Sequence, residues 1–313
     1  MFNGDSRGRV VVVTGAAGGI GAAIAARFAA EDRVVSLWDL DPAVHDTAAA
    51  LTAAGNQSSR PNTHSHSATA TSAAPTRVGD RDEEVRTSVD PGHGSAAAID
   101  TARTASVHGV TIDITDADAV RAAFDRLTSE HGRVEVLAHA AGLMVGGTAL
   151  ELDADDWARC LTVNATGTML VTQRAAADMA AVGRGSIVVV TSNAAATPRV
   201  GMAAYGAAKA AATAFTRSLA LQVAPLGVRV NLVSPGSTDT AMLRDMFGGT
   251  PLDDDAETAL LDGDPAAYRL GIPLRRIATP ADIAGAVHFL ASEDARHITM
   301  HDLRVDGGAT LDM

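Results

Sequence analysis

The chain has little cysteine, little positive charge and no long apolar run. Its 313 residues include one cysteine, Cys160, which excludes an intramolecular disulfide and makes a reducing, cytoplasmic compartment the expectation. The formal net charge is −12, without a run of Lys or Arg, and this argues against nucleic acid and anionic membrane surfaces as partners. No apolar run approaches the ~18 residues of a transmembrane helix, and the run that begins at Val10 is too short for a signal peptide.

The chain does contain an alternation of short β-branched runs with longer Ala-rich segments. The short runs predict strands at Val10–Val13, Arg33–Trp38, Gly109–Ile112, Val134–Ala138, Ser186–Val190 and Val228–Val233. The longer segments predict helices at Gly18–Ala30, from about Ala43, and at Asp116–Glu130, Asp155–Ala180 and Met202–Ala224. Such an alternation with continuously apolar strands indicates one α/β domain over residues 1–313, a doubly wound parallel sheet of the Rossmann type with helices on both faces. Ligands are then expected beyond the carboxyl ends of the strands.

One segment departs from this alternation. From about Gly55 to His108 the chain is rich in Ser, Thr, Ala, Gly, His and Asp, and it has no aromatic residue. Because such a composition has no periodicity and cannot bury a core, residues 55–108 are predicted to form a disordered insertion within the domain. His64 and His66 lie in it, but no cysteine accompanies them and no ligand spacing is visible, so we predict no metal site.

A glycine-rich turn joins the first predicted strand to the first predicted helix, in VVVVTGAAGGIGAAIAARF. Gly15, Gly19 and Gly21 allow a tight turn and bring backbone N–H groups close to a pyrophosphate at the helix N-terminus, although a merely tight turn is the alternative. Asp39 ends the second strand, where a carboxylate accepts hydrogen bonds from the ribose hydroxyls of NAD and repels the extra phosphate of NADP. Asp113, which ends the third strand, is expected to meet the adenine amino group or to cap a helix.

The stretch TSNAAATPRVGMAAYGAAK, which begins at Thr191, holds four polar groups that could serve one reaction. A secondary alcohol loses hydride to a nicotinamide only if its proton leaves too, and a free phenol with a pKa of ~10 is a poor base near neutrality. Lys209, one helical turn after Tyr205, supplies positive charge that favours the phenolate, so Tyr205 is the expected general base. Ser192 is expected to hydrogen-bond the substrate oxygen.

These residues together resemble the short-chain dehydrogenase/reductases over the whole chain except the insertion. The resemblance is carried by the glycine loop, HAAG at His139–Gly142, Asn164, Ser192, Tyr205, Lys209, and SPGSTDT at Ser234–Thr240. It implies that Asn164 disturbs its helix and anchors a water that relays the proton outward, and that Lys209 also holds the nicotinamide ribose. It implies cofactor contacts from Gly15, Gly19, Ile20, Gly21, Asp39, Asp113, Ala141, Gly142, Tyr205, Lys209, Pro235 and Thr240. The family usually has Asn where His139 stands, and usually forms homotetramers.

Four stretches are similar to one branch of that family: ATPRVGMAAYGAAKAA, VSPGSTDTAM, RLGIPLRRIATPADIA and HITMHDLRVDGGATL. The members of this branch oxidise a dihydroxycyclohexadiene carboxylate to a dihydroxybenzoate with NAD⁺ in catechol siderophore biosynthesis. The resemblance leaves open a sister enzyme that acts on the amino analogue. An NADPH-dependent ketone or oxoacyl reductase, which Asp39 disfavours, is another alternative, as is a catalytically inactive dinucleotide sensor, which the intact Ser, Tyr and Lys set disfavours.

A carboxylate substrate requires a cationic partner. Arg199 lies in the loop between the predicted catalytic serine and tyrosine, and its guanidinium is expected to hold the acid group, a surface arginine being the alternative. Ser237 is expected to add a hydroxyl to the same carboxylate. Met242 and Met246 are expected to form an apolar lid over the substrate ring, or else to pack a short helix onto its own body. Cys160 is expected to be a core residue and not a nucleophile.

Overall fold

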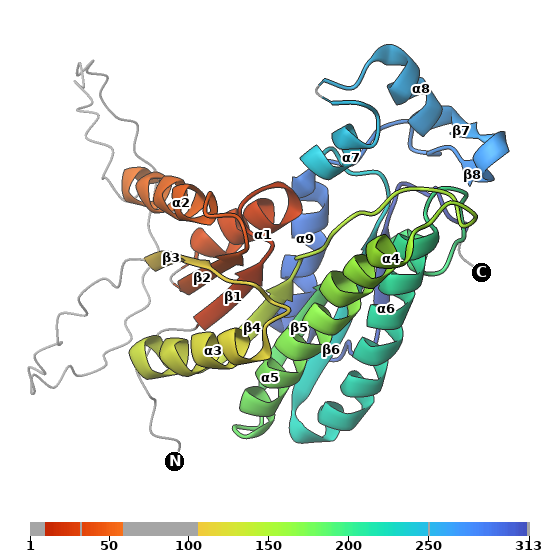
Figure 1. Ribbon diagram of the computed structural model, residues 1–313. Coiled ribbons are helices and arrows are strands. Elements are labelled where there is room, and N and C mark those ends of the chain that lie inside the picture. The colour runs from red at the N-terminus through yellow and green to blue at the C-terminus, as the bar shows by residue number, and fades with distance from the viewer. Residues whose placement is uncertain (1–9, 32, 59–105, 250, 312–313) are drawn as a thin grey trace, which may run out of the picture.

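The computed structural model describes residues 10–31, 33–58, 106–249 and 251–311, and a parallel sheet of seven strands lies at its centre (Figure 1). The strands are β1 (Val10–Thr14), β2 (Val34–Asp39), β3 (Ser106–Thr111), β4 (Val134–His139), β5 (Gly185–Val190), β6 (Val228–Pro235) and β9 (Asp302–Val305). Their order is β3-β2-β1-β4-β5-β6-β9, so the winding reverses between β1 and β4. This confirms the predicted doubly wound fold and places the expected ligand site above that reversal.

Helices cover both faces of the sheet. One face carries α1 (Gly19–Ala29), α2 (Val44–Ser58) and α9 (Pro280–Ala291), and the other carries α3 (Ala117–His131), α5 (Thr168–Ala180) and α6 (Ala203–Val223). Strand β1 shows why its run is continuously apolar: Val11 and Val13 pack toward the first layer, and Val10 and Val12 toward the second. Because successive strand side chains point to opposite faces, a strand covered on both sides is apolar at every position.

The predicted helix Asp155–Ala180 is confirmed in its bounds, but its middle is a π-helix and not an α-helix. It divides into α4 (Ala154–Leu161), a π-helix at Thr162–Gly167, and α5. Within the π-helix the Asn164 side chain bonds to backbone outside its own helix, and Thr168 Oγ1 donates to the Asn164 carbonyl at 2.6 Å. Side-chain bonds to the helix backbone compete with the ordinary helical pattern, which explains the local widening.

The predicted insertion 55–108 is too wide at both ends. Residues 55–58 belong to α2, and Ser106–His108 belong to β3, which pairs with β2 from Val34↔Ser106 to Asp39↔Thr111. Backbone pairing to an existing strand needs no apolar run, so composition alone did not reveal this part of β3. Residues 59–105, the rest of the predicted insertion, lie outside the described residues.

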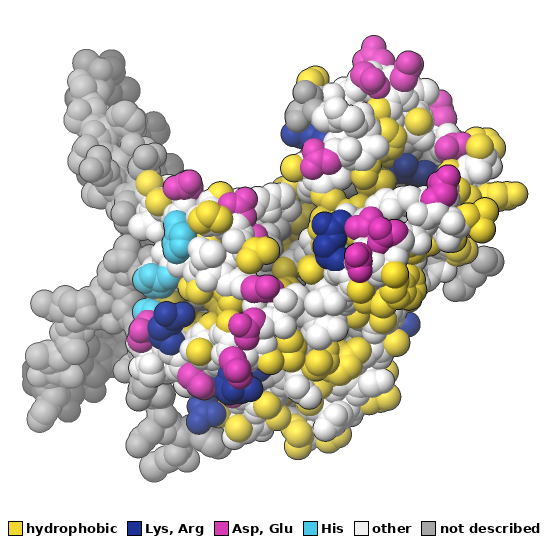
Figure 2. All heavy atoms as spheres, viewed as in Figure 1, with side chains coloured by type: hydrophobic (Ala, Val, Ile, Leu, Met, Phe, Trp, Pro, Cys, Tyr) yellow, Lys and Arg dark blue, Asp and Glu magenta, His cyan; other side chains and the backbone are white. Residues whose placement is uncertain are grey.

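A small lobe beyond the carboxyl ends of the strands was not predicted. It contains α7 (Ala241–Asp245), α8 (Asp254–Asp262) and a two-stranded hairpin of β7 (Gly263–Asp264) and β8 (Arg269–Leu270). Figure 1 shows these blue elements standing above the sheet, and Figure 2 shows the hollow between this lobe and the main body. The remaining short 3₁₀-helices are Asn193–Ala195, Ala224–Leu226, Pro265–Ala267 and Glu293–Ala295. In the described ranges no helix is both long and apolar enough to cross a membrane.

Candidate active site

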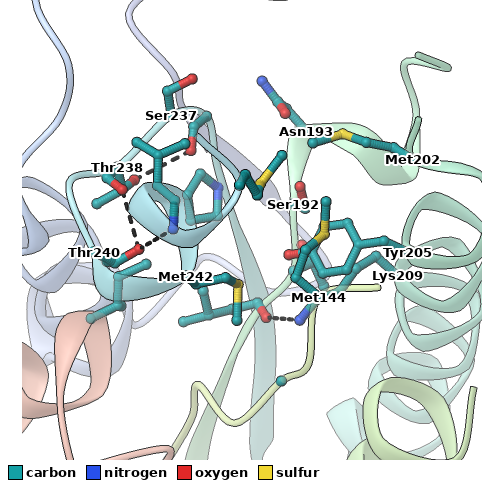
Figure 3. Close-up of a pocket in the computed structure, with 18 of the residues that line it drawn as sticks. Met144, Ser192, Asn193, Met202, Tyr205, Lys209, Ser237, Thr238, Thr240 and Met242 are labelled. Atoms are coloured by element: carbon teal, nitrogen blue, oxygen red, sulfur yellow. Dashed lines mark hydrogen bonds between the residues drawn. The ribbon is translucent and has the colours of Figure 1, made fainter. Parts of the chain in front are cut away.

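The pocket at the carboxyl ends of the strands joins the main body to the lobe. Predicted residues that line it are Ile20, Gly142, Ser192, Arg199, Tyr205, Lys209, Pro235, Ser237, Thr240, Met242 and Met246. Figure 3 shows Ser192, Tyr205 and Lys209 on the side of β5 and α6, with Ser237 and Thr240 on the side of the lobe. Residues far apart in the sequence are therefore brought together as expected for a substrate held between the sheet and the lobe.

Tyr205 and Lys209 lie one turn apart on α6, and Ser192 follows the end of β5. Burial raises the pKa of the Tyr205 phenol to about 12, and a hydrogen bond with Ser192 opposes this rise only in part. Burial lowers the pKa of the Lys209 ammonium to about 8. Its Nζ lies 5.7 Å from the Tyr205 ring centroid and donates to the Val190 carbonyl at 3.2 Å. In the protein alone Tyr205 is therefore a neutral phenol near pH 7, and Lys209 does not by itself make it a base.

Asn164 is tied to the loop after β4. Its Nδ2 donates to the Leu143 carbonyl at 2.7 Å, and its Oδ1 accepts from the Leu143 N–H at 3.2 Å. Gly142 lies between Asn164 and Lys209: a Cβ there would sit 2.9 Å from Asn164 Oδ1 and 3.1 Å from Lys209 Nζ. A side chain at this position would push the two polar groups apart. The π-helix agrees with the predicted disturbance at Asn164, and the proton-relaying water stays a prediction.

His139, where the family usually has Asn, is fully buried in a chain of hydroxyl contacts. Its Nδ1 lies 2.8 Å from Thr14 Oγ1, and its Nε2 lies 3.0 Å from Thr168 Oγ1. Since Thr168 already donates its hydrogen to the Asn164 carbonyl, Nε2 must carry the imidazole proton and donate it to Thr168. Thr14 in turn accepts from the N–H groups of Ala140 and Ala141, each at 3.2 Å, so its hydrogen points to Nδ1.

This arrangement requires a neutral imidazole. Burial and the nearby Lys209 charge lower the pKa of His139 to about 3. His139 thus joins the ends of β1 and β4 to the π-helix, and it holds the backbone of predicted cofactor residue Ala141 through Thr14.

The glycine loop has the features that a dinucleotide needs. Gly15 has φ +69°, and a Cβ there would lie 2.7 Å from the Ala141 nitrogen, so only glycine fits. Helix α1 begins with Gly18 as its N-cap and no side-chain cap, which leaves its first N–H groups for a phosphate. Asp39 is held beside the loop, because its Oδ2 accepts from the Ala17 N–H at 2.9 Å.

The other predicted cofactor residues fall into two groups. Gly19 (φ +54°) and Thr240 are close, since a Cβ on Gly19 would lie 3.3 Å from Thr240 Cγ2, and Gly21 is buried in the first turn of α1. Thr240 also caps α7, accepting from the Leu243 N–H at 3.3 Å. Asp113 is exposed, and its Oδ1 accepts from the N–H and hydroxyl of Thr115, while the N-cap of α3 is Asp116. Asp113 is therefore a turn residue and not the cap, and its contact with adenine stays a prediction.

The predicted substrate residues have definite partners. Arg199 Nη1 donates to Asn193 Oδ1 at 2.9 Å, and Asn193 Nδ2 donates to Asp306 Oδ2 at 3.2 Å. Met242 and Met246 are 39% and 42% exposed at the pocket, a placement that suits a lid.

Cys160 is fully buried beside Val145, Ala204 and Ala208, and burial raises the pKa of its thiol, so its expected place in the core is confirmed. Within the described part of the chain, no group of three or more His, Cys, Asp or Glu could hold a metal ion.

Several residues that line the pocket were not predicted. They include Met144, Asn193, Met202 and Arg269. Arg269 lies on β8, and its Nη2 donates to Ser237 Oγ at 2.6 Å. No local pattern marks it, because a basic residue between Tyr268 and Leu270 reads as an ordinary surface residue until the lobe folds over the sheet.

Comparisons with known proteins agree with this geometry. Residues 85–310 match the family model described as enoyl-(acyl carrier protein) reductase. The vibriobactin-specific 2,3-dihydro-2,3-dihydroxybenzoate dehydrogenase of Vibrio cholerae is 43% identical over 201 residues, covering 64% of this chain and 75% of that protein. The cis-4-hydroxycyclohexanecarboxylate dehydrogenase of Sinomonas cyclohexanicum is 33% identical over 96% of each chain. The solved structure of a short-chain type dehydrogenase/reductase from Mycobacterium ulcerans has a TM-score of 0.72 and 25% identity, covering 96% of this chain and 89% of that one.

Proposed function

The chain belongs to the short-chain dehydrogenase/reductase family of oxidoreductases, and we propose that it oxidises 2,3-dihydro-2,3-dihydroxybenzoate to 2,3-dihydroxybenzoate with NAD⁺. The observation that carries the proposal is Arg199, a cation for an acid group, in the same pocket as Ser192, Tyr205 and Lys209. The similarity to the Vibrio cholerae dehydrogenase supports a substrate whose ring carries two hydroxyl groups. In this role the enzyme would serve catechol siderophore biosynthesis.

The chemistry follows from the residues around the alcohol. The oxidised nicotinamide, when bound, supplies the hydride acceptor and a positive charge. Ser192 holds the alcohol oxygen, and Tyr205 Oη takes its proton while the hydrogen on the same carbon leaves as hydride. The ketone that results becomes a catechol by moving one proton, so no second oxidant is needed. Because the pKa of Tyr205 is about 12, the phenol needs the positive charges of both Lys209 and the oxidised nicotinamide to act as a base.

We further propose NAD and not NADP as the cofactor, because Asp39 is fixed by the Ala17 N–H beside the glycine loop. A carboxylate there binds ribose hydroxyls and repels a phosphate. We also propose a cytoplasmic homotetramer that packs α4, α5 and α6 against partner copies. Exposed Trp157 on α4 and Leu221 on α6, 40% and 63% exposed, support such contacts.

The test of this function is a substitution at Arg199. Arg199→Ala should raise KM for the acid substrate ~10- to 150-fold, equivalent to about 1.5–3 kcal/mol for a hydrogen bond to a charged group. Arg199→Lys should recover only part, because an ammonium cannot reproduce the guanidinium fork. A neutral cyclic diol without the carboxylate should respond to neither change. An unchanged KM for the acid, or equal damage to both substrates, would assign Arg199 a structural role instead.

A second candidate is a saturated cyclic hydroxy acid, favoured by the relative from Sinomonas cyclohexanicum, which matches this chain over nearly its whole length. The amino analogue, dihydro-3-hydroxyanthranilate, is a third, since it shares the ring and the carboxylate. NADH formation followed at 340 nm with each acid in turn separates the three. The proposed function requires the highest kcat/KM with the dihydroxy acid.

A further inference from the structure

Arg269 and Ser237 form a second polar group at the pocket, apart from the catalytic residues. Both line the pocket together with Arg199. We propose that Arg269 is a second carboxylate-binding residue, which completes with Arg199 and Ser237 a site for the acid group of a cyclic hydroxy acid. The proposal rests on the proposed function for the ring and the reaction, and on the following contacts for the acid.

Neither arginine forms an ion pair with a carboxylate in the part of the chain that the structure describes, although Asp306 and Asp264 act on them from a distance. Arg199 donates to the neutral amide of Asn193, and Arg269 donates to the neutral hydroxyl of Ser237. The ion pairs of the described arginines all involve other residues, such as Arg244 with Asp239. Two guanidiniums thus keep N–H groups for a ligand at the pocket wall.

The electrostatics of the pair favour an anion. Burial lowers the pKa of the Arg199 guanidinium, and the Asp306 charge offsets this only in part. Burial also lowers the pKa of the Arg269 guanidinium, and the charge of Arg199 lowers it further, against the weaker influence of Asp264. Two like charges that are partly removed from water repel each other, and a bound carboxylate would relieve both the repulsion and the lost hydration.

Ser237 fits the same ligand. Its oxygen already accepts from Arg269, so its own hydrogen remains to be donated. The acid group would then meet two guanidinium forks and one hydroxyl, all of them donors. Such a donor set binds a carboxylate strongly and gives a neutral hydroxyl group no comparable partner.

The backbone holds the two arginines in register. The Val200 N–H, next to Arg199, donates to the Ala267 carbonyl at 3.4 Å, which links the Arg199 loop to the hairpin of Arg269. Tyr268, between Ala267 and Arg269, has φ 53° and is 81% exposed, so the chain turns sharply just before Arg269. The lobe therefore carries Arg269 to the pocket as part of a connected structure.

Binding of 2,3-dihydroxybenzoate and of catechol, which differ only in the carboxylate, tests the site directly. Both are titrated by calorimetry into the full-length protein saturated with NADH. Arg269→Gln should weaken the binding of 2,3-dihydroxybenzoate ~10- to 100-fold, as expected for the loss of hydrogen bonds to a charged group. The affinity for catechol should not change. Arg269→Lys should recover part of the acid affinity. The matched control is Arg276→Gln, since Arg276 is 57% exposed, pairs with Asp282 and does not line the pocket.

The outcomes separate this site from the proposed function. If the acid binds in an Arg269-dependent way but the dihydroxy acid yields no NADH, the carboxylate site stands and the proposed function fails. If the acid is turned over and Arg269→Gln changes neither its KM nor its affinity, the site is wrong and the function stands. The site is also overturned if Arg269→Gln weakens the binding of the acid and of catechol equally, or if the wild-type protein does not bind the acid. Circular dichroism shows whether the Gln variant is folded, and the Lys variant gives the same comparison if it is not.

Discussion

Acid should unfold this protein through His139. The imidazole is fully buried and must stay neutral, because Nδ1 accepts from Thr14 and Nε2 donates to Thr168. Its pKa is about 3 in the fold, against 6.5 when exposed. The folded state thus binds fewer protons than the unfolded state between these values. The stability that His139 contributes is complete above pH 6.5 and is lost as the pH falls toward 3.

The size of this loss follows from the two pKa values. They differ by about 3.5, and each unit corresponds to about 1.4 kcal/mol, so the full loss is about 5 kcal/mol. By the same relation about 2 kcal/mol is lost at about pH 5 and about 3 kcal/mol at about pH 4. Such losses are a large fraction of the stability of an ordinary domain, roughly 5–15 kcal/mol.

The assay compares the wild type with His139→Asn by urea unfolding between about pH 7.5 and 4, at one protein concentration because association would change the apparent stability. Asn can donate and accept as His139 does, but it does not titrate. Between about pH 7.5 and about pH 5, the unfolding free energy of the wild type should therefore fall by about 2 kcal/mol more than that of the variant. His301→Asn, at an exposed histidine, is the control and should follow the wild type. Parallel curves for the wild type and His139→Asn would refute the reasoning.

Four further outcomes are expected. Asp39→Ala should reduce the preference for NAD⁺ over NADP⁺, and equal wild-type kcat/KM with the two cofactors would contradict the role of Asp39. Tyr205→Phe should lower kcat by roughly 10²–10⁴, the usual contribution of a general base, with NADH affinity retained by fluorescence titration; a smaller loss would point to another base. Deleting residues 60–104 should leave soluble, active protein, because their composition cannot pack and loop length has little effect on closure; inactive or insoluble protein would show a structural role. Light scattering at micromolar concentration should give the mass of a tetramer, and a monomer mass would exclude the packing proposed for α4, α5 and α6.

The amino-acid sequence by itself determined the features that depend on neighbours along the chain. The β-branched runs and the spacing of Gly15, Tyr205 and Lys209 set the strand, turn and helix geometry locally. Apart from β3, which begins at Ser106 and not at Gly109, the fold confirms the predicted strands to within two residues. Asp39 was identified in the same way, because the carboxyl end of the second strand of such a sheet lies beside the glycine loop that follows the first strand. Local periodicity did not reveal β9, since its residues include Asp302 and Arg304 and its existence depends on pairing with β6.

Only the tertiary structure decided which distant side chains meet. Ser237 and Arg269 are 32 residues apart, and His139 contacts Thr14 across 125 residues. Such contacts depend on how the lobe and strands pack, and a single polar residue carries no periodic signal of its eventual partner. The widened helix at Asn164 has the same cause, because its side chain bonds to the Leu143 backbone from another element. The sequence could therefore name the candidate catalytic residues and propose Arg199 and Ser237 for the acid group, while the place of Arg269 beside Ser237 and the neutral state of His139 follow only from long-range packing.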